Sequence, residues 1–416
     1  MIKKILYTAV ILISVFKLNA QQVAVSPYSF YNFGELAFEG TNENKLIGGG
    51  LSVNDSVNLN ILNPAALSKL RFTAFSLGGN STFLRLKNST SSERATSTNF
   101  DYLAIGIPTK YFGFSFGLKP YSRVGYKLEN FYQVDQKQHV KQFYGKGGIN
   151  QTFLSFGFKI NKNLSFGLQG FYNFGTINHS SLLNKEGILL TTREENESKV
   201  QGFNFSLGLS YFKKIRSNRQ LNLGLTYTPK TALKSETIRE LATISFDGNG
   251  NELIHDRISS TLANQELIVP NKVGIGVSFQ EINKWLVSLD YNYLENNSLN
   301  NLYETGTLVE YNNGMNMSLG GYYIPNHDSY SKFFHRVMYQ ASISYKASGM
   351  KINTASINQV GINFGVGVPL GLTRLHLGIE LGQRGTKSNN LLMEQYQTIL
   401  VGFSFGDKWF NKRKIN

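Results

Sequence analysis

Basic and polar side chains that share one face of a strand are the first candidates for a binding site. One segment carries them at even spacings, at Lys119, Tyr121, Arg123 and Lys127. A second segment has the same kind of spacing at Arg374, His376 and Glu380. A period of two places each set on one face of a β-strand. Guanidinium and ammonium groups on such a face could bind a carboxylate or phosphate head group. The alternative is that these charges pair with opposite charges inside the protein and hold its parts together.

Motifs for catalysis and metal binding are missing from the sequence. The chain has no cysteine, which excludes disulfides, thiolate zinc sites and cysteine nucleophiles. None of the six histidines has an HExxH or similar ligand spacing, so no metal is expected. His376 beside a serine on an outward face could form a lipase-like pair, but the strand parity turns His376 inward. The sequence therefore indicates a protein that is not an enzyme and uses no cofactor.

Large apolar residues alternate with small or polar residues through most of the chain after residue 71. In one segment Phe112, Phe114 and Phe116 alternate with Gly113 and Ser115. A soluble sandwich would carry solvated Lys and Glu on its second face, whereas here that face holds mainly Gly, Ser, Thr and Asn. Apolar residues toward lipid and small ones toward a lumen are typical of a transmembrane β-barrel, whose strands need about 9–11 residues.

The alternation predicts an all-β fold, a 14-stranded antiparallel transmembrane β-barrel. The predicted strands are 71–87, 96–107, 111–128, 148–160, 163–178, 200–214, 219–236, 264–280, 284–294, 314–324, 335–348, 354–369, 372–384 and 394–406. Tight turns follow most even-numbered strands, and polar loops follow the odd-numbered ones, the largest near 179–199, 237–263 and 295–313. Because barrels have short periplasmic turns and long external loops, both ends of the barrel are expected in the periplasm. The connection over 325–334 is longer than this rule predicts.

The two ends of the chain differ from the barrel segment. Residues 1–20 combine Lys3 and Lys4, an apolar run and the small residue Ala20, as in a secretory signal peptide. Residues 21–70 lack sustained alternation, and they are expected to form a plug in or under the barrel, or a disordered tail. The barrel is expected over 71–410, followed by a basic tail over 411–416.

The chain is strongly basic, with 42 Lys and Arg against 27 Asp and Glu and a formal net charge of +15. The basic residues are scattered, and an exported protein does not meet DNA, so no nucleic-acid partner is expected. The expected surroundings are a lipid bilayer and its lipopolysaccharide, because anionic head groups attract basic residues.

Three short motifs resemble one known family. They are residues 26–36 (SPYSFYNFGEL), the triplet Asn63-Pro64-Ala65 directly before the first predicted strand, and the ending formed by residues 384–386, 402–410 and 412–414. Together they resemble the FadL/OmpP1/TodX type of outer-membrane transport protein, in the form common in Bacteroidetes. The motifs span the mature chain, although each of them is short.

The resemblance implies a barrel whose N-terminal segment forms a hatch in the lumen, anchored by Asn63, Pro64 and Ala65. Such a barrel moves small hydrophobic or amphipathic compounds across the outer membrane, and Lys119, Arg123 and Lys127 would line the route. Other members of similar fold are partners of a protein-secretion apparatus. The alternative is therefore a barrel without transport that docks on another outer-membrane assembly.

Overall fold

The computed structural model describes residues 26–89, 91–299, 308–329 and 332–409, apart from the side chains of residues 263–265 and 390. The predicted signal peptide over 1–20 and the basic tail over 411–416 lie outside these residues. Within the described part of the chain, no helix is both long and apolar enough to span a membrane.

Fourteen antiparallel strands form a closed barrel, because the last strand β18 pairs with the first strand β2 along its whole length. The strand bounds are β2 (Thr73–Lys87), β3 (Ser92–Pro108), β4 (Phe112–Val134), β5 (Lys137–Lys159), β6 (Leu164–Lys185), β7 (Thr191–Lys214), β8 (Arg219–Thr228), β9 (Thr231–Phe246), β10 (Glu252–Val269), β11 (Lys272–Glu281), β12 (Trp285–Leu294), β13 (Val309–Tyr311), β14 (Gly314–Tyr323), β15 (Met338–Ile352), β16 (Ala355–Leu370), β17 (Thr373–Gly385) and β18 (Met393–Asp407). Three of the fourteen are interrupted, so that β8 continues as β9, β10 as β11 and β13 as β14. Pro229 and Pro270 lie at the first two breaks, since proline lacks the N–H that the ladder needs. The prediction of a 14-stranded barrel is confirmed.

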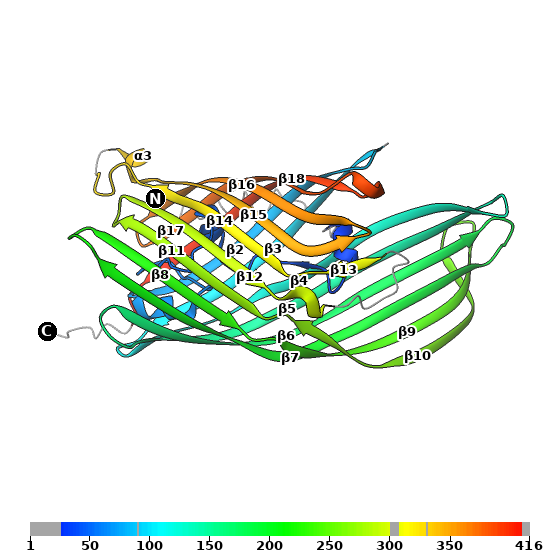
Figure 1. The fold of residues 1–416 in the computed structure, drawn as a ribbon, viewed down its shortest axis with the longest axis horizontal. Coiled ribbons are helices and arrows are strands. Elements are labelled where there is room, and N and C mark those ends of the chain that lie inside the picture. Colours follow the sequence, from blue (N-terminus) through cyan, green and yellow to red (C-terminus); the bar gives the residue numbers. More distant parts are fainter. Residues whose placement is uncertain (1–25, 90, 300–307, 330–331, 410–416) are drawn as a thin grey trace.

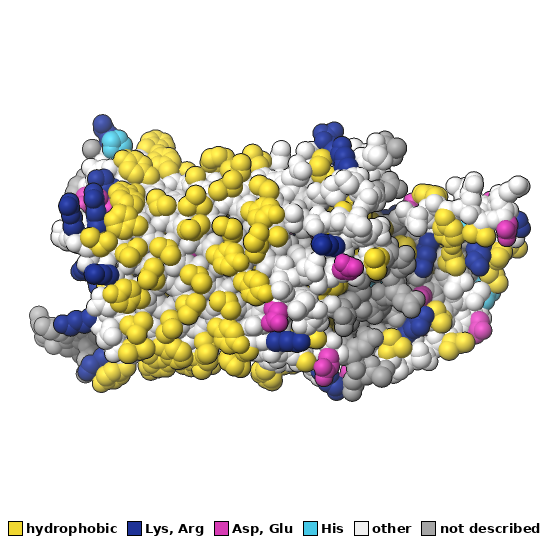
Figure 2. All heavy atoms as spheres, in the orientation of Figure 1, with side chains coloured by type: hydrophobic (Ala, Val, Ile, Leu, Met, Phe, Trp, Pro, Cys, Tyr) yellow, Lys and Arg dark blue, Asp and Glu magenta, His cyan; other side chains and the backbone are white. Residues whose placement is uncertain are grey.

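The outer face of the barrel is apolar and the inner face is small or polar. One row of directly paired residues faces outward, each side chain 42–48% exposed: Leu289, Leu319, Ile343, Ile362 and Leu381. The adjacent row faces the lumen: Ser288, Gly320, Ser342, Asn363 and Glu380. Figure 2 shows the outward residues joined into a broad apolar belt, which is the surface that a bilayer covers.

Six strands extend far beyond this belt on one side of the barrel. They are β4, β5, β6, β7, β9 and β10, and Figure 1 shows them as a curved wall that projects at one end of the barrel. The predicted loops over 179–199 and 237–263 are therefore wrong, because these residues mostly continue as strands. Beyond the bilayer the outer face of a strand meets water while the inner face stays buried, so the ladder continues although the outward residues are no longer apolar.

Residues 26–70, called the lumen segment below, lie inside the barrel. Their short elements are η1 (Pro27–Phe30), β1 (Glu35–Leu36), α2 (Asn42–Leu46) and η2 (Pro64–Lys69). The segment contacts opposite sides of the wall: η2 packs on β4 to β7, and α2 packs on β15 to β18. A short helix α3 (Phe333–Arg336) lies in the irregular connection before β15.

Candidate functional site

Asn63, Pro64 and Ala65 attach the lumen segment to the wall. The Asn63 side-chain oxygen accepts the N–H of Ala65 at 3.0 Å and so caps η2, and Pro64 provides the fixed φ that suits the first helical position. The Asn63 amide donates to the carbonyl of Leu51 at 2.8 Å and to that of Leu209 in β7 at 3.0 Å. Asn63 is fully buried, so each of these bonds replaces water that the side chain has lost.

A stripe of glycines on four neighbouring strands makes room for η2. A β-carbon added at any of them would lie only 2.2–2.5 Å from an atom of residues 63–67. The glycines are Gly113 in β4, Gly157 in β5, Gly167 in β6 and Gly208 in β7. The backbone of the lumen segment therefore lies directly against the backbone of the wall.

Ion pairs fix the rest of the lumen segment to strands around the barrel. The pairs are Lys45 with Glu380 at 2.6 Å, Glu39 with Lys272 at 2.5 Å, Glu35 with Arg384, and Glu43 with Arg374 at 3.7 Å and His376 at 3.4 Å. Three of the predicted site residues, Arg374, His376 and Glu380, thus face the lumen segment. His376 is buried, and Gln340 also contacts its ring at 3.3 Å, so it does not reach the lipid-facing wall that a lipase-like pair would need.

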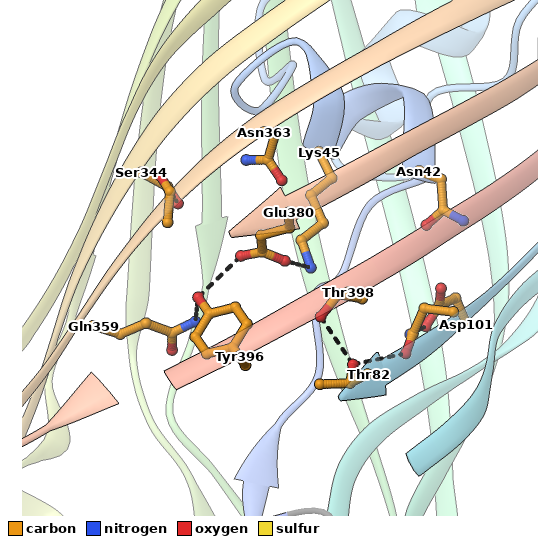
Figure 3. A network of polar contacts seen from close by, with 12 residues as sticks. Asn42, Lys45, Thr82, Asp101, Ser344, Gln359, Asn363, Glu380, Tyr396 and Thr398 are labelled. Carbon is orange, nitrogen blue, oxygen red and sulfur yellow. Dashed lines mark hydrogen bonds and ion pairs between the residues drawn. The ribbon is translucent and has the colours of Figure 1, made fainter. Parts of the chain in front are cut away.

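Figure 3 shows how Lys45 enters a polar network on β2 and β16 to β18. Glu380 accepts a hydrogen bond from the Tyr396 hydroxyl at 3.1 Å, and Gln359 donates to the same hydroxyl at 2.7 Å. At the first position of α2, the Asn42 amide donates to the carbonyls of Gly79 at 3.2 Å and Val401 at 2.8 Å.

The predicted cationic ladder is divided among three environments. Lys119 is buried in the lumen, where its Nζ donates to the backbone carbonyl of Glu39 at 3.1 Å. The Tyr121 ring stacks on Phe33 of the lumen segment, with 5.7 Å between centroids. Arg123 lies at the wall between lumen and exterior.

Lys127 is not in the lumen, which corrects the prediction. A β-bulge between Pro120 and Ser122 shifts the register and inverts the face of every later residue of β4. Tyr126 and Leu128 consequently pack in the interior, and the Lys127 side chain is 59% exposed on the outer face. The strict alternation used for the prediction cannot detect such a bulge, although Pro120 marks the place.

The acidic residues of the lumen segment are the site residues that the prediction missed. Glu35, Glu39 and Glu43 each pair with a basic residue of the wall. Asp290 of β12 also accepts the backbone N–H groups of Gly50 at 2.5 Å and Leu51 at 2.8 Å. The available signal was complementary charge, since three glutamates within nine residues precede a barrel with cations on its inner face.

These ion pairs keep the lumen-segment carboxyls charged. Burial by itself raises the pKa of Glu39, but Lys272 and Lys119 outweigh it and lower the pKa to about 2. Burial likewise opposes ionisation of Glu43, yet His376 and Arg374 hold its pKa below the ordinary value.

The barrel wall opens between β3 and β4. The two strands pair only between Leu103–Pro108 and Gly113–Leu118, and beyond Leu118 β4 pairs with β1 of the lumen segment instead. A cavity of about 860 Å³ lies at this opening, lined by residues that include Phe100, Pro120 and Arg123. A smaller lumenal cavity of about 120 Å³ shares Asn99 and Arg123 with it.

Arg123 bridges the opening. Its guanidinium pairs with Asp101 of β3 at 3.1 Å and donates to the carbonyl of Phe100 at 2.7 Å. One side chain therefore joins two strands that no longer share a ladder, at the point where the two cavities meet.

The closed 14-stranded barrel defines a class of membrane β-barrel whose fold several solved structures share. The Pseudomonas putida toluene transporter TodX superposes with a TM-score of 0.58 at 16% identity, over 94% of this chain and 100% of that one. A Pseudomonas aeruginosa FadL homologue gives 0.61 at 12% identity, over 89% of this chain and 99% of that one. The CymD monoaromatic hydrocarbon channel gives 0.57 at 13% identity, over 94% and 100%. These similarities confirm the FadL/TodX type of fold.

The chain belongs to the BamG family, whose model matches residues 1–416. No curated protein matches the sequence. The resemblance predicted from the motifs thus holds for the fold, and the family is BamG.

Proposed function

We propose that the protein is an outer-membrane channel for a small hydrophobic or amphipathic compound, with the lumen segment as its hatch. The observation that carries the proposal is the opening between β3 and β4, where a cavity of about 860 Å³ meets a lumenal cavity at Asn99 and Arg123. A compound dissolved in or near the bilayer can enter such an opening without crossing the polar mouth of the barrel. The fold shared with TodX and CymD, named as a toluene transporter and a hydrocarbon channel, supports the same role.

In this proposal Arg123 controls entry and the lumen segment controls passage. Lys119 and Arg374 line the interior beside the hatch, where a carboxylate or phosphate of an amphipathic compound would compete with Glu39 and Glu43. Displacement of those carboxylates by the ligand would release the hatch from the wall.

The test is uptake by cells that depend on this protein. Radiolabelled toluene and oleate serve as the two probes, in cells with the gene deleted and then restored. We expect uptake of at least one probe to fall several-fold on deletion and to return on complementation. Equal uptake of both probes in all strains would contradict the channel role.

A second function, a docking subunit of another outer-membrane assembly, is favoured by one feature. Six strands rise beyond the apolar belt, which gives the protein a large exposed wall (Figures 1 and 2). A native pull-down from detergent-solubilised membrane, with mass spectrometry of proteins and of the organic extract, separates the two functions. A lone barrel with a bound lipid-like molecule supports the channel, and a stoichiometric protein partner with no small molecule supports the subunit.

A further inference from the structure

The net positive charge of the described residues is concentrated at the end of the barrel that carries the short turns, because few acids lie there. Thirteen Lys and Arg lie there, against four acids, Asp55, Glu281, Asp328 and Asp407. We call the thirteen the basic collar: Lys69, Arg71, Lys110, Lys159, Lys162, Lys213, Lys214, Arg216, Arg219, Lys284, Lys332, Arg336 and Lys408. Figure 2 shows dark blue side chains gathered at this end, past the apolar belt.

Little in the described part of the chain neutralises the collar. Glu281 pairs with both Arg219, at 3.1 Å, and Lys284, at 3.2 Å, and these are the ion pairs that join the collar to an acid. The opposite end of the barrel differs, because its charges alternate in sign and pair with one another. Arg193 there contacts both Glu240, at 2.7 Å, and Glu252, at 2.6 Å.

The collar continues inside the rim of the barrel. Lys69, at the end of η2, lies 3.3 Å from the centroid of the Phe212 ring. Phe212 is on the same face of β7 as Ser210, which bonds to Asn54 of the lumen segment, so this face is the inner one. Burial, with Lys159 and Arg71 nearby, lowers the pKa of Lys69 to about 8. An anion brought to this place would relieve the repulsion among the three cations.

This position distinguishes two anionic partners. Phospholipid head groups surround the barrel and can reach cations on its outer perimeter. They do not reach Lys69, which lies on the inner face behind the rim. A protein surface seated across the mouth would contact the turn tips and Lys69 together.

We propose that the basic collar is a docking surface for an acidic face of a periplasmic protein. The inference rests on the proposed placement in the outer membrane, which puts the short turns in the periplasm. The summed field of the collar attracts such a partner over about one Debye length, so association is faster at low salt. Docking at this mouth is compatible with either function proposed above.

The first experiment tests the orientation, using the absence of native cysteine. Single-cysteine variants Ser217→Cys, in the turn before β8, and Asn249→Cys, in the β9–β10 connection, are treated with a membrane-impermeant maleimide on intact cells. We expect labelling of Asn249→Cys at once and of Ser217→Cys only after the outer membrane is permeabilised. The reverse pattern would overturn the placement on which the inference rests.

The second experiment tests docking with the full-length protein in cells. A photo-crosslinking amino acid replaces Ser217, and adducts are identified by mass spectrometry. We expect one protein adduct, linked through an acid-rich region, that falls at least five-fold in the triple variant Lys213→Glu, Lys214→Glu, Arg216→Glu.

The matched control reverses three cations on the opposite end, Lys137→Glu, Lys141→Glu, Lys185→Glu, and should leave the adduct unchanged. Heat-modifiable migration of all variants on gels confirms that the barrels are folded. Adducts with phospholipid alone, no adduct, or an adduct insensitive to charge reversal at the collar would each overturn the inference.

Discussion

A single guanidinium holds the wall together where the ladder between β3 and β4 ends. Arg123 pairs with Asp101 and bonds to the carbonyl of Phe100, and both cavities border it. Its side chain is 20% exposed and that of Asp101 is 15% exposed, so the pair is partly shielded from water and is stronger than an open surface pair. A long side chain in this position can move aside without any change in the backbone of the barrel.

Replacement of Arg123 should therefore widen the opening. In an Asn99→Cys background, we expect Arg123→Gln to raise the rate of reaction with a hydrophobic maleimide several-fold, because Asn99 lines both cavities. The measurement is labelling rate by mass spectrometry in detergent micelles. Lys159→Gln, an exposed cation of β5 that borders neither cavity, is the control, and an unchanged rate in Arg123→Gln would contradict the role of the guanidinium.

Asn63 is the second residue with a defined effect. Asn63→Ala removes the cap of η2, worth about 1 kcal/mol, and leaves buried carbonyls of residues 51 and 209 without their donor, at about 1–3 kcal/mol. We expect the lumen segment to loosen while the barrel stays closed, which limited trypsin cleavage after Lys45 or Lys69 would report. The exposed Asn297→Ala is the control, and equal cleavage of both variants would show that Asn63 does not hold the segment.

At the scale of elements, the lumen segment packs closely because four wall residues that face it have no side chain. Gly113, Gly157, Gly167 and Gly208 let η2 approach four strands at backbone distance. No large wall side chain lies between η2 and these strands, so the contact is made mainly by backbone atoms that are already ordered. Forming the contact therefore costs little side-chain conformational entropy. A single added side chain must therefore move η2 or distort the strand.

Two glycines of β6 provide a matched comparison. A β-carbon at Gly167 would lie 2.2 Å from the backbone nitrogen of Ala65, whereas one at Gly170 has no atom within 4 Å. We expect Gly167→Val to displace η2 and to raise single-channel conductance in planar bilayers, because the lumen would be less filled. Gly170→Val should match the unaltered protein, and identical traces for the two variants would contradict the packing argument.

The elements differ in how far sequence predicted them. Strands inside the belt were predictable because lipid and lumen impose opposite demands on alternate residues, as for Leu319 and Gly320. The extensions of β6 and β7 were not, since both of their faces carry polar residues, as in the adjacent pairs Ser180–Glu195 and Ser181–Glu194. Lys127 was assigned to the wrong face because the bulge in β4 changes which face the later residues occupy, and a bulge leaves no mark in the alternation of residue types. The prediction that residues 26–70 lie in the lumen rested on the family resemblance. This segment is built from short helices and turns, which leave no periodic pattern in the sequence.

At the scale of the whole molecule, ion pairs of both polarities join the barrel to the lumen segment. Glu35, Glu39 and Glu43 pair with cations on β11 and β17, and Lys45 pairs with an acid of β17. The lumen segment is thus held electrostatically as well as by packing, and its attachment depends on the ionisation of its carboxyl groups.

Acid should therefore release the lumen segment before it disrupts the barrel. A carboxyl group whose pKa is lowered in the attached state stabilises that state fully when the pH is above the group's ordinary pKa. This stabilisation is lost as the pH falls from the ordinary pKa through the lowered pKa. For Glu39 this window runs from about pH 4.5 down to about pH 2. We expect single-channel conductance to stay constant from neutral pH to the top of this window and to rise below it. A rise that is complete above the window would contradict the assignment.

Asn42 links the two strands whose pairing closes the barrel. Its amide bonds to Gly79 in β2 and to Val401 in β18, the two strands whose pairing closes the ring. Those strands come from opposite ends of the barrel sequence, and the last of them begins at Met393, about 350 residues after Asn42. The Asn42 amide spans the seam from within, so it ties together the first and the last strand at the place where the ring closes. A ring that closes over an unplaced segment would lack these two hydrogen bonds at its seam, and its unfilled lumen would leave it a leaky pore.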